Sequence, residues 1–179
     1  MLEIVWITVC PECRVGWGPE DDPACTTEGH GRVPYETHRH RTPVVLPDGT
    51  TVVAVSFHGA DPYGRPEDEV PAFGLYLDER WQPPWTHGHV DWPDFGVPAD
   101  VGALRAALTD VLERARAGER VELGCLGAHG RTGTALACLA VLTGVPAPDA
   151  VAWVRETYCD QAVETPGQAE LVAAFGADA

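Results

Sequence analysis

The sequence predicts an α/β fold in which a central, mostly parallel sheet is flanked by helices and preceded by a β-rich extension. Short apolar runs bounded by glycine and proline, which are typical of buried strands, occur between residues 43 and 123. In the second half of the chain, such runs alternate with segments of helical periodicity. A glycine-rich turn joins the last strand to an almost wholly apolar helix, as expected when helices pack on a sheet.

The size and charge of the chain narrow the functions that it can have. Its 179 residues suit one domain with a small appendage, which can bury a core without disulfides. The net charge is −15, every basic residue is arginine, and no segment is basic, which disfavours broad binding to nucleic acid or to an anionic membrane. No apolar run approaches the ~20 residues that span a bilayer. The N-terminus has an early acid and no basic region, unlike a signal peptide, so we expect a cytoplasmic protein.

Residues 1–42 are expected to form a Cys/His-containing extension, because proline, glycine and acidic residues leave them without the periodicity of long elements. Three cysteines and a histidine could surround a tetrahedral zinc ion: Cys10, Cys13, Cys25 and His30. His38 and His40 are alternatives for the fourth ligand. Free surface cysteines are the alternative to a metal. If zinc is bound, it is expected to be structural, since four protein ligands leave no open position.

Residues 43–179 are expected to form the second domain, which contains the sheet. Two β-rich runs surround the turn at 47–49, Pro-Asp-Gly, which favours a hairpin. A short buried strand is expected at 73–77, and another strand candidate covers 87–92, after a loop rich in tryptophan and proline. The next strand, 121–123, precedes the glycine-rich turn.

Four helices are expected in the second domain. The first can begin at the Pro-Ala-Asp sequence of residues 98–100, its apolar residues recur at helical spacing, and Gly118 lies just past its end. The buried apolar helix follows the glycine-rich turn. The three later helices are expected at residues 134–144, 148–158 and 167–175.

The turn after strand 121–123 has the composition of an anion site. Cys125 leaves the strand, and Arg131 follows six positions later at the start of the buried helix. The backbone amides between them could curl around one tetrahedral oxyanion, and the helix N-terminus adds about half a positive charge. Arg131 could hold two phosphoryl oxygens at once, and the same field would stabilise a thiolate on Cys125. The residues of this cradle are Leu126, Gly127, Ala128, His129, Gly130 and Arg131.

Three motifs resemble those of one enzyme family. Cys125, five further residues, Arg131 and Thr132 resemble the phosphate-binding signature of the cysteine-dependent protein tyrosine phosphatases, which include dual-specificity phosphatases. Residues 92–98, Trp-Pro-Asp-Phe-Gly-Val-Pro, look like the acid loop of that family. Residues 164–168, Glu-Thr-Pro-Gly-Gln, are similar to its glutamine-containing loop. The motifs stand in the family's order.

The resemblance implies hydrolysis of a phosphate monoester through a cysteinyl-phosphate, with no metal or organic cofactor for catalysis. Cys125 would attack phosphorus while Arg131 and the loop amides hold the charge. Asp94 would protonate the leaving oxygen and then act as the base toward water. Thr132 matches the hydroxyl residue that assists departure of the thiolate, and Gln168 matches the residue that positions the water. The partner would be a phosphorylated protein or small molecule.

Three positions depart from the family's pattern. Gly124 stands where a histidine usually precedes the cysteine, Ala128 where the signature has its first glycine, and Glu164 where many members have glutamine. A catalytically weak or inactive module that binds phosphorylated ligands is therefore the alternative hypothesis. A phosphatase for a small phosphate ester is the alternative to one that acts on phosphotyrosine.

Overall fold

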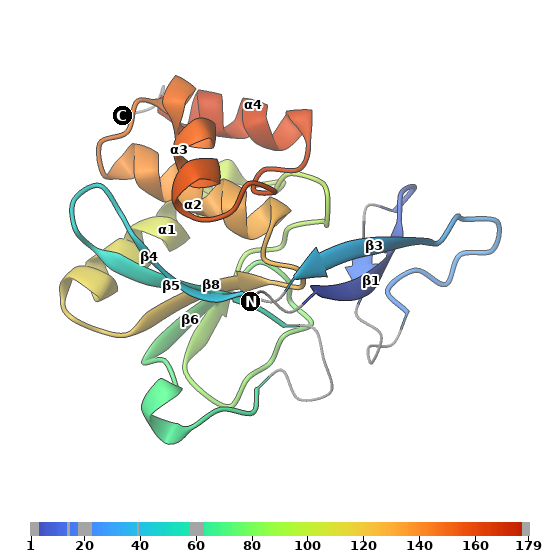
Figure 1. Ribbon diagram of the computed structural model, residues 1–179, viewed down its shortest axis with the longest axis horizontal. Coiled ribbons are helices and arrows are strands. Elements are labelled where there is room, and N and C mark those ends of the chain that lie inside the picture. Colours follow the sequence, from blue (N-terminus) through green and yellow to red (C-terminus); the bar gives the residue numbers. More distant parts are fainter. Residues whose placement is uncertain (1–3, 14, 18–22, 39, 58–62, 177–179) are drawn as a thin grey trace.

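The computed structural model forms two sheets and a set of helices (Figure 1). It describes residues 4–13, 15–17, 23–38, 40–57 and 63–176. The strands are β1 (Ile4–Cys10), β2 (Val15–Trp17), β3 (Val33–His38), β4 (Arg41–Val45), β5 (Thr51–Ser56), β6 (Phe73–Tyr76), β7 (His87–His89) and β8 (Val121–Cys125). The helices are α1 (Val101–Arg116), α2 (Gly130–Leu142), α3 (Ala150–Thr157) and α4 (Pro166–Phe175), with 3-10 turns η1 (Glu67–Glu69) and η2 (Ala147–Asp149).

The larger sheet has the strand order β4-β5-β8-β6-β7. Only β4 runs antiparallel to its neighbour, and the pairs β5–β8, β8–β6 and β6–β7 are parallel. Strand β8 therefore lies in the centre, with parallel neighbours on both sides. Figure 1 shows α2, α3 and α4 together on one side of this sheet. The predicted mostly parallel sheet flanked by helices is confirmed.

The smaller sheet lies in the extension and is wholly antiparallel, with the order β2-β1-β3. The extension is β-rich, as expected, although its irregular composition did not locate the three strands. In Figure 1 this sheet projects to one side of the larger sheet. Strand β4 already begins at Arg41, and it pairs with β5 across the predicted turn, in which Gly49 has a φ of +87°.

The helices largely follow the sequence pattern. Asp100 caps α1, and its carboxylate oxygen accepts a hydrogen bond from the backbone N–H of Ala103 at 2.8 Å. The helix predicted at 148–158 begins instead as the turn η2, and α3 starts only at Ala150. Strand β7 ends at His89 rather than at residue 92. Among the described residues, no helix is long and apolar enough to cross a membrane.

The two faces of the larger sheet are covered by different layers. Leu75 and Leu123 belong to a large apolar core that the helices share. Tyr76 is the residue after Leu75, and Glu122 is the residue before Leu123. Both therefore face the opposite side of the sheet, because side chains alternate along a strand. There Glu122 accepts a hydrogen bond from the Tyr76 hydroxyl at 2.8 Å and forms a buried ion pair with Arg65 at 2.6 Å. Ile7 and Val9 of β1 pack into the aromatic cluster on this second face, which places the extension beside the ends of the parallel strands.

Candidate active site

Cys125 is the last residue of the central strand β8, and the turn that follows leads directly into α2. Cys125 is only 2% exposed. The backbone N–H of Ala128 donates a hydrogen bond to the sulfur at 3.2 Å, and the hydroxyl of Thr132 donates another at 3.1 Å. One donor of the predicted cradle, Ala128, and the predicted hydroxyl residue, Thr132, thus lie at the sulfur. Ligands bind at the carboxyl ends of parallel strands in open α/β sheets, and this turn occupies such a position.

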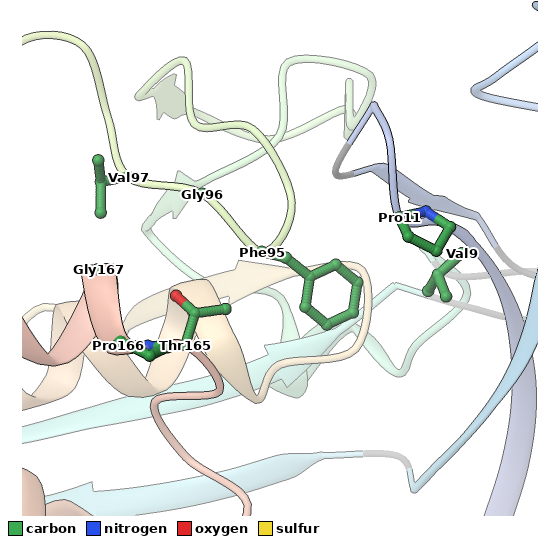
Figure 2. Close-up of a pocket in the computed structure, with 8 residues that line it drawn as sticks. All are labelled: Val9, Pro11, Phe95, Gly96, Val97, Thr165, Pro166 and Gly167. Atoms are coloured by element: carbon green, nitrogen blue, oxygen red, sulfur yellow. The ribbon is translucent and has the colours of Figure 1, made fainter. Parts of the chain in front are cut away.

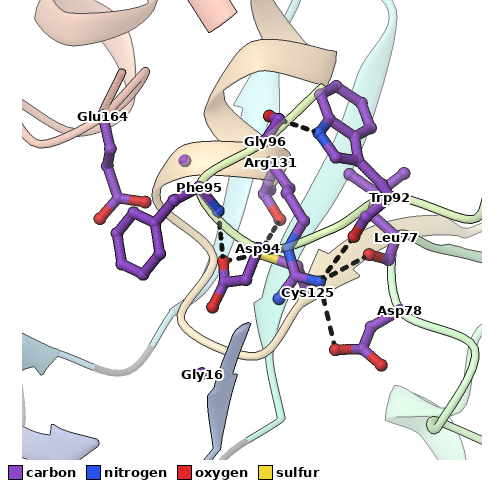
Figure 3. A network of polar contacts seen from close by, with 12 residues as sticks. Gly16, Leu77, Asp78, Trp92, Asp94, Phe95, Gly96, Cys125, Arg131 and Glu164 are labelled. Carbon is purple, nitrogen blue, oxygen red and sulfur yellow. Dashed lines mark hydrogen bonds and ion pairs between the residues drawn. The ribbon is translucent and has the colours of Figure 1, made fainter. Parts of the chain in front are cut away.

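Arg131 lies beside this thiol and is also 2% exposed (Figure 3). Its Nη1 donates to the backbone oxygens of Leu77 at 3.0 Å and Trp92 at 3.1 Å, and to Asp78 Oδ2 at 3.2 Å. Its Nε and Nη2 have no hydrogen-bond partner among the described residues. Buried guanidinium donors are normally satisfied, so Nη2, together with Nε, which forms an ion pair with Asp94 Oδ1 at 3.3 Å, fits an oxyanion held beside the backbone amides.

Asp94 reaches the same group from the loop of residues 92–98. Its Oδ1 lies 3.3 Å from Arg131 Nε and accepts a hydrogen bond from the backbone N–H of Phe95 at 3.2 Å (Figure 3). Burial raises the pKa of Asp94 above its usual value; the charge of Arg131 opposes this shift, and that of Asp78 adds to it. A carboxyl group that keeps its proton to higher pH is suited to act as a general acid.

The pKa of Cys125 does not follow the sequence-based expectation. Burial raises the pKa of this thiol, Arg131 and the hydrogen bonds from Thr132 lower it, and the carboxylate of Asp94 raises it again, with a net upward shift. Burial is thus the main obstacle to the expected thiolate in this arrangement, and the carboxylate of Asp94 adds to it by offsetting the field of Arg131. Ionisation of the thiol is linked to the charge of the acid.

Gln168 joins two loops around the site. It is fully buried, its Nε2 donates to the backbone oxygen of Gly96 at 3.2 Å, and its Oε1 accepts from the backbone N–H of Glu164 at 2.9 Å. Its amide thus connects the loop of Asp94 to the segment before α4. Glu164 lies against Gly130, where its carboxylate leaves no room for a Cβ, so its side chain is at the wall of the cradle.

The glycine before the nucleophile is required by packing. A Cβ at Gly124 would lie 2.6 Å from both the Cγ2 and the backbone oxygen of Val55, on the neighbouring strand β5, and 3.1 Å from Phe57. A histidine at this position does not fit the backbone as it stands. The cradle must therefore be held by other side chains.

Two residues of the site were missed by sequence reasoning. Asp78, which is 8% exposed, pairs with Arg131 and at 2.7 Å with Arg80. Burial raises the pKa of Asp78, but the hydrogen bonds and charges of the two arginines outweigh it and lower the pKa on balance. Asp78 follows a strand parallel and adjacent to β8, a position that could have identified it. Arg80 also donates to the backbone oxygen of Gly16 in the extension at 2.9 Å.

Two pockets meet at Phe95. A narrow one reaches the thiol and is lined by Ile7, Asp94, Phe95, Cys125, Gly127, His129, Gly130 and Glu164. A wider, mainly apolar cavity of about 640 Å³ lies beside it (Figure 2). In Figure 2, Val9 and Pro11 of the extension stand on one side of the Phe95 ring, and Thr165, Pro166 and Val97 on the other. The extension is thus part of the wall of the site.

The predicted metal ligands gather at one point of the extension. The ligand atoms of Cys10, Cys13, Cys25 and His30 all lie within 4.8 Å of one another. The two sulfurs of Cys13 and Cys25 are 3.5 Å apart, and His30 Nδ1 lies 3.7, 3.1 and 3.6 Å from the three sulfurs. Tetrahedral zinc with ordinary bond lengths requires separations of about 3.8 Å between sulfurs and about 3.5 Å between sulfur and nitrogen. The donor set and its spacing therefore fit zinc.

The two alternative ligands lie elsewhere or outside the described part. His40 is buried next to His129, with their Nε2 atoms 3.2 Å apart, and does not belong to the cysteine cluster. The side chain of His38 lies outside the described residues. Of the histidines considered, His30 is the one that the structure brings to the cysteines.

Known proteins that resemble this chain were found among sequences and among solved structures. No family model matches the chain. Two uncharacterized proteins of Methanocaldococcus jannaschii are 36% identical over 109 residues (55% of this chain and 71% of the relative) and 33% identical over 135 residues (66% and 82%). Among solved structures, Tk-PTP in its active form matches with a TM-score of 0.59 and 26% identity, over 76% of this chain and 97% of the other.

Two further solved structures match at lower identity and indicate the fold alone. Kinase associated phosphatase (KAP) has a TM-score of 0.63 at 12% identity, covering 78% of this chain and 95% of the other. Human DUSP28 has a TM-score of 0.59 at 15% identity, covering 76% and 96%.

Proposed function

We propose that this chain, which belongs to the same family as the two uncharacterized M. jannaschii proteins and has the fold of protein tyrosine and dual-specificity phosphatases, hydrolyses phosphate monoesters through a cysteinyl-phosphate. The observation that carries the proposal is the buried guanidinium of Arg131. Within the described part of the chain, its Nε and Nη2 have no hydrogen-bond partner, although Nε forms an ion pair with Asp94, while Nη1 is fixed by three acceptors. Nη2, and Nε when Asp94 moves to the leaving group, could then bind two oxygens of a tetrahedral oxyanion.

In the first step, the thiolate of Cys125 attacks phosphorus, an S–P bond forms and the P–O bond to the leaving group breaks. Asp94, which lies 3.3 Å from Arg131 and has a raised pKa, gives its proton to the leaving oxygen. Arg131 and the amides of the cradle stabilise the charge on the phosphoryl oxygens.

In the second step, water attacks phosphorus, the S–P bond breaks and phosphate leaves. Asp94, now ionised, takes the proton of the water and regains its starting state. Thr132, whose hydroxyl already donates to the sulfur at 3.1 Å, stabilises the departing thiolate. Gln168 holds the loop of Asp94 through Gly96, so its contribution includes the placing of the acid as well as of the water.

The surroundings of the cradle favour a substrate with one phosphate and an apolar body. Arg131 is a cation at the cradle, whereas Arg80 is already engaged by Asp78 and by the extension. Carboxylates of Asp94 and Glu164 line the narrow pocket, which disfavours further phosphates. The apolar cavity next to Phe95 offers a surface for the remainder of the molecule, either a small ester or a phosphorylated side chain.

The alternative function is that of a module that binds phosphorylated ligands without turnover. It is favoured by the raised pKa of Cys125, since a protonated thiol is a poor nucleophile. The acid loop argues against it, because binding alone does not need Asp94.

The test is the hydrolysis of an aryl phosphate from pH 5 to 8, combined with rapid acid quenching and mass spectrometry of the peptide that contains Cys125. We expect turnover and a phosphorylated Cys125 peptide in the wild type. Cys125→Ser should lower turnover by at least about 10³-fold, because the nucleophile is lost. Turnover that survives in Cys125→Ser would refute the mechanism. If the wild type shows no turnover but vanadate raises its melting temperature, the binding module is the correct function.

We also propose that the Cys/His cluster of the extension binds a structural zinc ion through Cys10, Cys13, Cys25 and His30. The measurement is the metal content of protein purified without chelators. One equivalent of zinc is expected, and Cys13→Ser should lose most of it, whereas Cys138→Ser should keep it because Cys138 is buried within α2. Less than half an equivalent in carefully prepared wild type would contradict the proposal.

A further inference from the structure

The cradle around Cys125 contains a backbone conformation that needs support. Ala128 has a φ of +60°, in the left-handed region that residues with a Cβ rarely adopt. This conformation directs its N–H to the sulfur of Cys125, at 3.2 Å. Such strained residues persist where the surrounding structure fixes them. The neighbours of Ala128 therefore determine whether the amide remains aimed at the sulfur.

One of these neighbours is Tyr158, which follows α3. Its hydroxyl donates a hydrogen bond to the backbone oxygen of Ala128 at 2.7 Å. Burial keeps the pKa of Tyr158 well above its usual value, so the phenol remains a donor throughout the neutral range. A side chain at Gly124 cannot give the loop this support, since a Cβ there would lie 2.6 Å from Val55.

Two buried histidines, His40 and His129, lie next to Tyr158 and the loop. His40 and His129 are 5% and 2% exposed, and their Nε2 atoms are 3.2 Å apart, so one imidazole donates and the other accepts. The ring of His40 also packs on Tyr158, with centroids 4.7 Å apart. The backbone of His40 pairs with Ser56, which lies opposite Cys125 in the register of β5 and β8.

We infer that Tyr158, His40 and His129 form a brace that positions the phosphate-binding loop, with Tyr158 holding Ala128 and His40 holding His129. The inference deepens the proposed function and rests on it for its catalytic meaning. The brace joins two consecutive residues of the loop to the end of α3 and to the residue before β4. It fixes the amide that contacts the nucleophile, in place of any side chain at Gly124. The three are positioning residues, with no part in the transfer of the phosphoryl group.

The experiment compares Tyr158→Phe with the wild type by two measurements that require no turnover. The first is the affinity for vanadate. The second is the pH profile of the alkylation of Cys125 by iodoacetamide, followed by mass spectrometry of its peptide. Loss of one hydrogen bond to the loop should weaken vanadate binding by about tenfold and move the midpoint of alkylation to higher pH. The matched control is Tyr63→Phe, which removes a hydroxyl that accepts a bond from the backbone of Gln82.

A second pair of variants tests the histidines. His40→Gln can still hydrogen bond to His129 and should preserve vanadate affinity within about twofold, whereas His40→Leu should behave like Tyr158→Phe. The inference is overturned if Tyr158→Phe keeps both wild-type vanadate affinity and the wild-type alkylation profile, or if Tyr63→Phe changes them equally. Turnover without a cysteinyl-phosphate would instead refute the proposed function, while these two measurements would still report on the brace.

Discussion

The extension and the larger sheet are stabilised in different ways. The larger sheet buries apolar side chains on both faces, and the residues of β6 and β8 are all buried. The extension has three strands, and its own core cluster consists of Trp17 and two of the cysteines, Cys10 and Cys25. Such a small core is insufficient alone, and small domains are commonly stabilised by a metal. Thus the candidate active site is built on the region with the large core, and the extension, whose proposed zinc would stabilise it, forms part of the wall of that site.

The extension contacts the rest of the molecule at Asp94. A Cβ at Gly16 in β2 would lie 2.5 Å from Asp94 Oδ2, so the backbone of the extension packs directly on the carboxylate. Arg80 connects the same strand to Asp78, which pairs with Arg131. We therefore expect that damage to the extension affects Asp94 and leaves Cys125 unchanged.

Among the variants at the contact between the two regions, Asp94→Asn is expected to have the largest effect on catalysis. It removes the general acid, and kcat for a poor leaving group should fall by about 10²-fold or more. Because the protonated form donates, the acid-dependent rate should decline as pH rises through the raised pKa of Asp94. The variant should lack this decline. The check is a pH–rate profile with p-nitrophenyl phosphate and with phenyl phosphate, whose leaving group needs the proton more. An equal loss with both esters would contradict the assignment of Asp94 as the acid.

Removal of the metal should have the next largest effect. With a strong chelator, or in Cys13→Ser, the extension should lose its fold, because the binding free energy of such a site is also folding free energy. Turnover of phenyl phosphate should fall about tenfold, while alkylation of Cys125 and the cooperative unfolding of the larger sheet persist. Unfolding of the whole chain by the chelator would contradict the view that the larger sheet is stable without the extension. Unchanged turnover after zinc has been shown to leave would contradict an effect of the extension on Asp94.

The sequence was sufficient for the parts of the site that are local along the chain. Cys125, Arg131 and Thr132 lie within one turn and the start of one helix, so their spacing predicts their proximity. The Trp-Pro-Asp motif predicted the loop of Asp94 by resemblance. Contacts between distant segments left no such pattern.

Asp78, Gly16 and Tyr158 illustrate what was missed. Asp78 reaches the site through the strand order, Gly16 through the docking of the extension and Tyr158 through the packing of α3, and none of these follows from local periodicity. The steric requirement at Gly124 is of the same kind, because it comes from Val55 on the neighbouring strand. The upward shift of the Cys125 pKa has a related origin. The sequence indicates which charges belong to the site, but burial and the distance of Asp94 decide which of them prevails.

The smallest expected effect tests the contact between the regions directly. Gly16→Ala adds a methyl group at the carboxylate of Asp94 and should displace it by a few tenths of an ångström or more. Turnover of phenyl phosphate should fall about three- to fivefold, with p-nitrophenyl phosphate much less affected, because only the acid is disturbed. Gly31→Ala is the matched control in the same extension, where the new Cβ meets its nearest neighbour, Glu12, at 3.4 Å. If both variants behave alike, the extension acts through its overall stability. A loss confined to Gly16→Ala, with zinc content and vanadate affinity unchanged, would establish that the backbone of β2 positions the acid.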